Sequence, residues 1–224
     1  MASPQAPLQT PSHLQPTPAR VSDRGALRGA IGLSILTLAG FGFLYSLAGV
    51  GIGQALFQDA ANGSLVERDG RIVGSALVAQ PFVGDRYFQP RPSAADYNPM
   101  ALAGSNQART NPDLRKRLED AREAIARREG VEPAAVPDDL FTQSGSGVDP
   151  HITPQAAVLQ INRIARARGV GRDAIARLVK RHTQEKQWGI FGQARVNVLE
   201  LNLALDALAP LPSGDARGTP GPAR

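Results

Sequence analysis

The hydrophobic positions of the chain form one long run near its N-terminus. No charged residue occurs from 29 to 58, and 29–53 consists largely of Ile, Leu, Ala, Val, Phe and Gly. At about 1.5 Å per residue this helix would span about 37 Å, more than the ~30 Å hydrocarbon core of a bilayer. A cleaved signal peptide has a shorter apolar region, and a soluble core helix seldom runs so far without a charge. We therefore expect a transmembrane helix over 29–53.

The residues around this helix indicate its orientation. Arg20, Arg24 and Arg28 flank its N-terminal side, whereas its other side meets Asp59 first and has no Lys or Arg before Arg68. Because positive charge is retained in the cytoplasm, we expect a cytoplasmic N-terminus and an extracytoplasmic (periplasmic) main domain, held in the cell inner (plasma) membrane by a single pass. Small residues at four-residue spacing would let another helix pack closely: Gly42, Ser46, Gly49 and Gly53.

Both ends of the chain are rich in proline and poor in large apolar residues. We expect a disordered cytoplasmic tail over 1–28 and a second disordered tail over 209–224. Most of the net charge of +5 lies in these tails. The region between them lacks the basic excess that favours binding to nucleic acid, so we expect no nucleic-acid partner.

The region 55–208 begins with a strand pattern and continues with helical ones. Segments 64–68 and 71–75 flank Asp69-Gly70, a dipeptide that accepts the positive φ angles of a tight turn, which predicts a β-hairpin. A capping residue, a proline and a closing glycine predict helices over 112–130 and 154–169.

Helical periodicity recurs in 175–182 and in 198–208, the second with Asn197 and Glu200 as a capping pair. The predicted fold class is therefore α+β. It consists of a single N-terminal transmembrane helix followed by an extracytoplasmic domain with a β-hairpin and several late helices.

The composition excludes several kinds of chemistry. There is no cysteine, which excludes disulfides, thiolate metal sites and cysteine nucleophiles. His13, His151 and His182 are the only histidines, too few for a zinc site without carboxylates, and we interpret His182 as a packing residue. The chain has no G-x-x-x-x-G-K-[ST] phosphate loop. We expect no catalytic residue and no metal ligand.

One polar loop combines Ser, Gly, Asp and His. It resembles a nucleophile elbow, but Ser144 stands where that motif needs glycine. A catalytic triad of Ser146, Asp149 and His151 would require one short segment to supply nucleophile, acid and base. The alternative functions for the chain are therefore a membrane-tethered serine hydrolase, which would need this triad, and a membrane-anchored binding protein. Because Pro150 restricts Asp149 to extended conformations, its carboxylate can accept backbone N–H groups in a turn. The candidate partner- or nucleotide-contact loop comprises Ser144, Gly145, Ser146, Gly147, Asp149 and His151.

A series of short blocks, in order along 29–208, carries a family resemblance. The blocks include Asn62-Gly63-Ser64-Leu65, Gly74-Ser75, Tyr87-Phe88, Arg91-Pro92-Ser93-Ala94, Gly104-Ser105-Asn106, Val136-Pro137, Asp149-Pro150-His151-Ile152, Arg168-Gly169 and Arg195-Val196-Asn197-Val198. Together they resemble the C subunit (KdpC) of the Kdp-type potassium-transporting P-type ATPase. Val148 departs from the family pattern, which usually has Leu there.

The resemblance implies an accessory subunit of a high-affinity, ATP-driven potassium uptake complex. Its implied partners are a channel-like potassium-binding subunit, a P-type ATPase subunit that hydrolyses ATP, and a small membrane peptide. The family role includes assembly and a proposed catalytic-chaperone action that raises the ATP affinity of the pump subunit. No tightly bound cofactor is implied, and ATP would be reached through the pump subunit, because an extracytoplasmic domain does not meet cytosolic ATP.

Overall fold

The computed structural model describes residues 25–210, which divide between Ala55 and Leu56 into two compact units. The first unit is helical and the second mixes helices with two small sheets, as the predicted fold class requires. The tails expected to be disordered lie outside the described residues, except for 25–28, 209 and 210.

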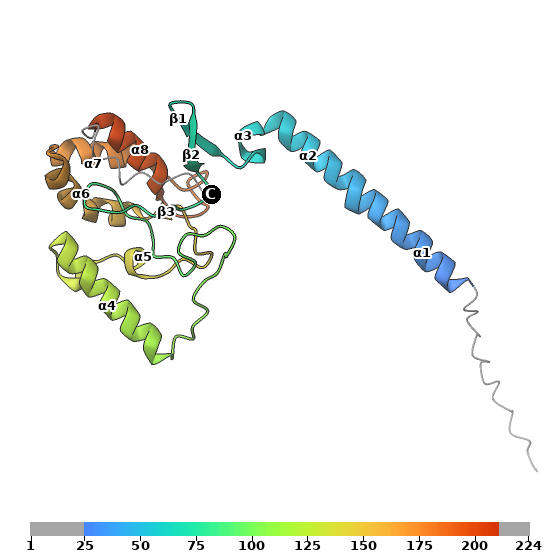
Figure 1. The fold of residues 1–224 in the computed structure, drawn as a ribbon, viewed down its shortest axis with the longest axis horizontal. Helices are drawn as coiled ribbons and strands as arrows, with labels where there is room; N and C mark the ends of the chain where they lie inside the picture. The colour runs from blue at the N-terminus through green and yellow to red at the C-terminus, as the bar shows by residue number, and fades with distance from the viewer. Residues whose placement is uncertain (1–24, 211–224) are drawn as a thin grey trace, which may run out of the picture. The chain divides into compact units, whose positions relative to one another are not determined.

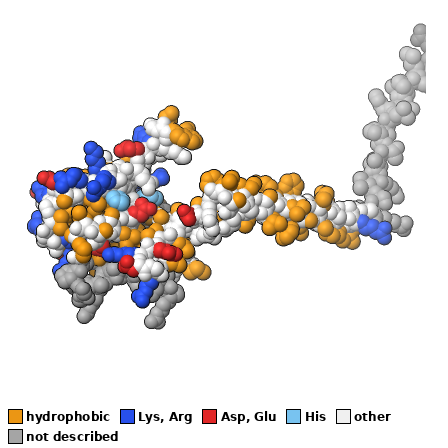
Figure 2. All heavy atoms as spheres, turned by 90° about the horizontal axis from the view of Figure 1, so that it is seen from above, with side chains coloured by type: hydrophobic (Ala, Val, Ile, Leu, Met, Phe, Trp, Pro, Cys, Tyr) orange, Lys and Arg blue, Asp and Glu red, His pale blue; other side chains and the backbone are white. Residues whose placement is uncertain are grey.

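One apolar helix of 31 residues, Ala26–Leu56, forms the first unit and ends one residue beyond it. An 18-residue window of this helix has a mean hydropathy of 1.8. It comprises α1 (Ala26–Thr37), a π-helical segment (Leu38–Leu44) and α2 (Tyr45–Leu56), and none of its residues is buried. Figure 2 shows hydrophobic side chains along this helix. It is the one helix in the described part of the chain that is long and apolar enough to cross a membrane. It extends beyond the expected 29–53 at both ends, because Ala, Leu and Arg at 26–28 and Gln, Ala and Leu at 54–56 are good helix formers.

The second unit starts with a short helix and a β-hairpin. Helix α3 (Gln58–Ala61) precedes strands β1 (Leu65–Arg68) and β2 (Arg71–Ser75), which pair antiparallel. Asp69 and Gly70 at the turn have φ angles of 53° and 72°. The expected hairpin and its turn are confirmed.

The helices of the second unit follow, and Figure 1 shows them gathered on one side of the hairpin. Their bounds are α4 (Pro112–Glu129), a 3-10 turn (Pro133–Ala135), α5 (Asp138–Phe141), α6 (Pro154–Arg168), α7 (Arg172–Arg181) and α8 (Val198–Leu208). Helix α6 packs against α4 and α7, and α7 packs against α8. His182 caps the C-terminal end of α7 and is half-buried, so it follows the apolar stripe and does not lie within it.

The caps form as the sequence predicts. The side chains of Asn111, Thr153 and Asn197 accept hydrogen bonds from backbone N–H groups in the first turns of α4, α6 and α8. Gly130 and Gly169 end α4 and α6 in the left-handed conformation that glycine tolerates best.

A second sheet was not expected from the sequence. Strands β3 (His151–Ile152), β5 (Arg195–Asn197) and β4 (Thr183–Gln184) form it in the order β3-β5-β4, all antiparallel. Strands of two or three residues are too short to show an alternating pattern. This sheet joins the polar loop to the start of α8.

The interior also contains backbone that belongs to no helix or strand. We call residues 85–91 the clamped segment, in which Tyr87 and Phe88 are buried. Asn202 of α8 accepts from Phe88 N and donates to Phe88 O, both at 2.9 Å. Gln160 of α6 accepts from Gln89 N at 2.8 Å and donates to Gln89 O at 3.2 Å. Two amide side chains therefore take the place of a neighbouring strand.

Two arginines continue this pattern on the carbonyl groups of the clamped segment. Arg163 donates to Asp85 O at 2.6 Å and to Tyr87 O at 3.0 Å, and Arg168 donates to Arg86 O at 2.7 Å. These carbonyls lie outside any helix or strand, and the guanidinium groups supply the hydrogen bonds that a buried backbone needs.

Each of these arginines has a buried carboxylate partner. Glu129 of α4 accepts from Arg163 Nε at 2.9 and 3.1 Å, and Asp206 of α8 accepts from Arg168 at 2.7 Å. Burial lowers the pKa of the Arg163 guanidinium, and the Glu129 carboxylate opposes that shift. Pairing removes most of the cost of placing these charges in the interior, whereas the loss of one partner would leave the other uncompensated.

The hydrogen bonds between Gln160 and the clamped segment can be tested by their effect on stability. Gln160→Ala would leave the N–H and C=O groups of Gln89 unpaired, so we expect the free energy of unfolding to fall by about 2–3 kcal/mol. Gln155 lies on the exposed face of the same helix, and Gln155→Ala should cost no more than about 0.5 kcal/mol. Urea unfolding of the full chain in detergent micelles, followed by circular dichroism, measures both variants. Equal effects would show that Gln160 does not hold Gln89.

Candidate functional site

The polar loop 144–151 packs along the segment that follows the clamp. Ser144 N donates to Pro92 O at 3.2 Å, and Ser93 Oγ donates to Gly147 O at 2.5 Å. Ser93 Oγ also accepts from the N–H groups of Ala95 and Tyr97 at 3.0 and 2.9 Å. The loop is therefore held by backbone and hydroxyl contacts from residues about fifty positions earlier in the chain.

The glycines of the loop allow backbones to approach closely. Gly147 has a φ of 78°, and a Cβ atom there would lie 2.7 Å from Ala103 O and 2.9 Å from Ala95 Cβ. A Cβ on Gly104 would lie 2.9 Å from Gly145 O. These distances are shorter than real contacts, so at Gly147 both space and conformation require glycine.

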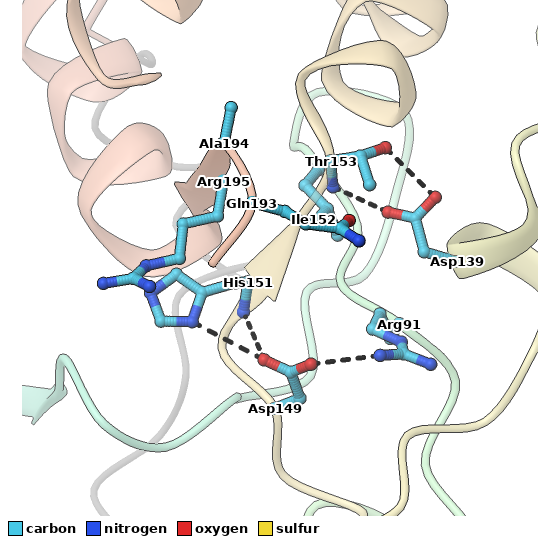
Figure 3. Close-up of a pocket in the computed structure, with 9 residues that line it drawn as sticks. All are labelled: Arg91, Asp139, Asp149, His151, Ile152, Thr153, Gln193, Ala194 and Arg195. Atoms are coloured by element: carbon cyan, nitrogen blue, oxygen red, sulfur yellow. Dashed lines mark hydrogen bonds and ion pairs between the residues drawn. The ribbon is translucent and has the colours of Figure 1, made fainter. Parts of the chain in front are cut away.

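Asp149 is the centre of the site (Figure 3). Its Oδ2 accepts from Arg91 at 3.1 Å, its Oδ1 accepts from His151 N at 3.0 Å, and His151 Nδ1 lies 3.5 Å from the same Oδ1. The expected turn, in which the carboxylate accepts a nearby backbone N–H, is confirmed. Burial raises the pKa of the Asp149 carboxyl, but hydrogen bonds from His151 and the charge of Arg91 outweigh it and hold the pKa below its ordinary value.

Arg91 connects this site to the clamped segment. Its guanidinium also donates to Gln143 O at 3.4 Å, and its carbonyl accepts from Tyr97 Oη at 2.8 Å. Burial, with the nearby charge of Asp96, raises the pKa of Tyr97 to about 12, so the phenol stays a proton donor. Arg91 is thereby fixed at both its main chain and its side chain.

An open pocket of about 230 Å³ lies beside this ion pair (Figure 3). Asp139 at the start of α5 accepts from Thr153 N at 2.7 Å and from Thr153 Oγ1 at 3.2 Å, which closes one side. The lining residues are Arg91, Asp139, Asp149, His151, Ile152, Thr153, Gln193, Ala194 and Arg195. Its charged groups are two arginines and two carboxylates, so the pocket does not select strongly for one sign of charge.

The geometry does not assemble a serine nucleophile. Ser146 is exposed, and its Oγ accepts from Val148 N at 3.2 Å; no hydrogen bond joins it to His151 within residues 25–210. Ser144 is buried, and its Oγ has no hydrogen-bond partner among residues 25–210. Of the six candidate loop residues, the structure joins Asp149 and His151 directly, while the two serines and two glycines shape the loop backbone. In the part of the chain that the structure describes, no three His, Asp or Glu side chains are grouped so as to hold a metal ion.

Sequence reasoning missed the residues that come from elsewhere in the chain. Arg91, Asp139 and Arg195 were not among the candidates, although Arg91 and Arg195 belong to the blocks that carry the family resemblance. Arg91 contacts Asp149 across 58 positions of sequence, and Asp139 and Arg195 line the same pocket from other segments, so no local pattern joins them to the loop. The remaining candidates are the four small residues of the apolar helix, Gly42, Ser46, Gly49 and Gly53. None of them is buried against another element within the described residues.

Comparison with known proteins identifies relatives over most of the chain. A family model described as KdpC, K+-transporting ATPase, c chain, matches residues 27–207. The Potassium-transporting ATPase KdpC subunit of Xanthomonas oryzae pv. oryzae is 55% identical over 196 residues, which cover 88% of this chain and 94% of the relative. The subunit of the same name from Xanthomonas campestris pv. campestris is 53% identical over 199 residues, covering 89% and 92%. That from Shewanella putrefaciens is 50% identical over 168 residues, covering 75% and 84%.

The lowered pKa of Asp149 gives a prediction about pH. A group whose pKa is lower in the folded state contributes stability above its unfolded pKa of about 3.9 and loses that contribution as the pH falls through its folded pKa. We expect Asp149→Ala to cost about 1 kcal/mol of unfolding free energy at pH 6 and the difference from wild type to shrink below about pH 4. Urea unfolding at several pH values measures it. Asp120→Ala, at an exposed carboxylate on α4, is the control and should show a smaller change in unfolding free energy at pH 6. A constant difference down to pH 2 would contradict the assignment.

Proposed function

The chain belongs to the family of the K+-transporting ATPase c chain, KdpC, and on this premise we propose that it is a non-catalytic subunit that docks its folded domain onto the membrane subunits of a potassium uptake complex. The observation that carries the proposal is the site around Asp149. Its polar groups pair with one another, and its serines form no nucleophile with the neighbouring histidine. Such a site can bind or position a partner, but it offers no reacting group.

The apolar helix supplies the membrane anchor in this proposal. Arg28 lies in its first turn, and the residues after it are uncharged up to Asp59. This asymmetry supports a cytoplasmic N-terminus, an extracytoplasmic domain and an inner-membrane location. The small residues Gly42, Ser46, Gly49 and Gly53 give the helix a surface on which a neighbouring membrane helix can pack closely.

The proposed partners are the channel-like potassium-binding subunit, the P-type ATPase subunit and the small membrane peptide of the complex. In this proposal ATP hydrolysis belongs to the P-type subunit, since this chain has no phosphate loop and no phosphorylatable Asp-Lys-Thr-Gly motif. An effect of this chain on ATP affinity then acts through its contacts with the pump subunit. No contact of the chain itself with the nucleotide is required.

We assign the docking contact to the loop 144–151. Four observations support this: the loop is ordered by Ser93 and Arg91, it lies at an open pocket, Gly145 and Ser146 are exposed, and His151 is half-buried at the rim. An ordered polar loop loses little conformational entropy on binding, so its contacts contribute more of their energy to affinity.

The docking role predicts a loss of assembly without a loss of fold. The double variant Asp149→Ala with His151→Ala should weaken association with the other subunits about tenfold, and lower potassium-stimulated ATPase activity of the complex in proportion. The unfolding midpoint of the full chain should fall by only a few degrees, as expected for about 1 kcal/mol. Co-purification from membranes through a tag on this chain, followed by the ATPase assay, measures the effect.

The matched control is Asp120→Ala with Glu123→Ala, which removes two exposed carboxylates of α4. This variant should assemble and function as the wild type does. Wild-type yield and activity in the Asp149/His151 variant would refute the docking role and leave the loop as a structural turn.

A further inference from the structure

An exposed apolar tip projects from the second sheet. Between strands β4 and β5, Trp188, Ile190 and Phe191 are 80%, 75% and 60% exposed. Three large apolar side chains within four residues, all open to solvent, form a patch of the kind that soluble surfaces usually avoid unless it binds something. We call residues 187–191 the apolar tip. It takes no part in the site around Asp149.

The tip is a rigid turn and not a loose loop. Gln187 and Phe191 exchange two backbone hydrogen bonds, at 2.9 and 3.0 Å, and Ile190 N donates to Gln187 O at 3.2 Å. The rings of Trp188 and Phe191 meet edge to face with centroids 6.0 Å apart. The turn therefore holds Trp188 and Phe191 together on its surface, and all three apolar side chains are exposed.

Trp188 occupies a backbone conformation that disfavours it. Its φ angle is 54°, in the left-handed region, and the next residue, Gly189, has a φ of 74°. Gly or Asn is the ordinary choice at the first of two such turn positions, because a bulky side chain is strained there. Strain of this kind clusters at functional positions, and here it accompanies an indole that is open to solvent.

Positively charged residues lie on both sides of the tip in the sequence. Residues 180–195 contain Lys180, Arg181, Lys186 and Arg195 against the single carboxylate of Glu185. All five side chains are exposed. An exposed indole with aliphatic and aromatic neighbours and exposed cations close by in the sequence matches the chemistry of a bilayer interface that contains anionic lipid.

The chain itself brings a bilayer within reach. The connection from the end of the apolar helix to β1 consists of residues 57–64. Even a fully extended connection of this length spans about 30 Å. A domain of this size is about 40 Å across. In any orientation of the domain, the tip stays within several tens of ångströms of the membrane surface. At this distance even a weak affinity for lipid is sufficient for the tip to bind the bilayer.

We propose that the apolar tip, with Trp188 at its apex and Lys186 and Arg195 beside it, inserts into the headgroup region of an anionic bilayer and steadies the domain on the membrane. The insertion is a separate role from the docking of the loop 144–151, although Arg195 also lines the pocket at that loop. The favoured occupant is lipid and not a second protein, because the patch consists of three apolar side chains flanked in the sequence by cations, whereas protein docking sites bury broad complementary areas.

Trp188 is the only tryptophan in the chain, so fluorescence reports on the tip alone. The full chain is reconstituted into phosphatidylcholine vesicles with and without phosphatidylglycerol, and with lipids brominated along the acyl chain. Insertion predicts blue-shifted emission and about twofold quenching by the brominated lipid, with little quenching by iodide in the water. Lys186→Gln with Arg195→Gln should reduce the quenching in phosphatidylglycerol vesicles and leave it unchanged in pure phosphatidylcholine.

Two apolar-to-polar variants complete the test. Ile190→Ser with Phe191→Ser should abolish most of the quenching, whereas Val83→Ser, at an apolar side chain 73% exposed elsewhere on the domain, should not change it. Emission typical of tryptophan in water, without quenching by brominated lipid, would overturn the proposal. A blue shift without such quenching would also overturn it, because it would mean that protein and not lipid covers Trp188.

Discussion

The constraint on which the domain depends is the burial of a backbone segment that belongs to no helix or sheet. Each buried N–H or C=O group left without a partner costs about 1–3 kcal/mol. The clamped segment meets this cost with side chains: the amides of Gln160 and Asn202 pair with Gln89 and Phe88, and Arg163 caps the carbonyl of Tyr87. Side chains of α6 and α8 thus make the backbone hydrogen bonds that a neighbouring strand would otherwise make. The polar residues Gln160 and Asn202 are buried in the core together with the apolar residues of these helices.

The proposed docking loop inherits its order from this clamp. Arg91, at the end of the clamped segment, reaches Asp149, and Ser93, two residues further on, holds Gly147. A change in α6 or α8 that released the clamped segment would remove the support on the N-terminal side of Arg91 and so weaken the order of the loop. Helix α8 also contacts the loop directly, because Val198 N donates to Pro150 O at 3.0 Å. The arginines that donate to the clamped segment must each be paired with a buried carboxylate. Arg163 pairs with Glu129, and Arg168 pairs with Asp206.

Local signals in the sequence predicted the apolar helix, the hairpin and the helix caps, because each depends on residues close together in the chain. Asp69-Gly70 and the cap at Thr153 are examples, and so is the turn in which Asp149 accepts from His151 N. What the sequence did not predict are contacts between distant residues. Gln160 reads as a polar interruption of a helical stripe, and nothing near it indicates that Gln89, 71 positions earlier, supplies its partner. The bridge from Arg91 to Asp149 joins residues 58 positions apart and was missed for the same reason.

Hydrogen exchange tests the role of the clamp most directly. With the full chain in detergent micelles or nanodiscs, the amides of Phe88 and Gln89 should exchange only when the whole domain unfolds, as slowly as those in the middle of α6. The exposed loop around Met100, which follows the same stretch of irregular backbone, should exchange many times faster. If Phe88 and Gln89 exchanged as fast as that loop, side chains of α6 and α8 would not be holding the clamped segment, and the account of how the loop 144–151 is ordered would be wrong.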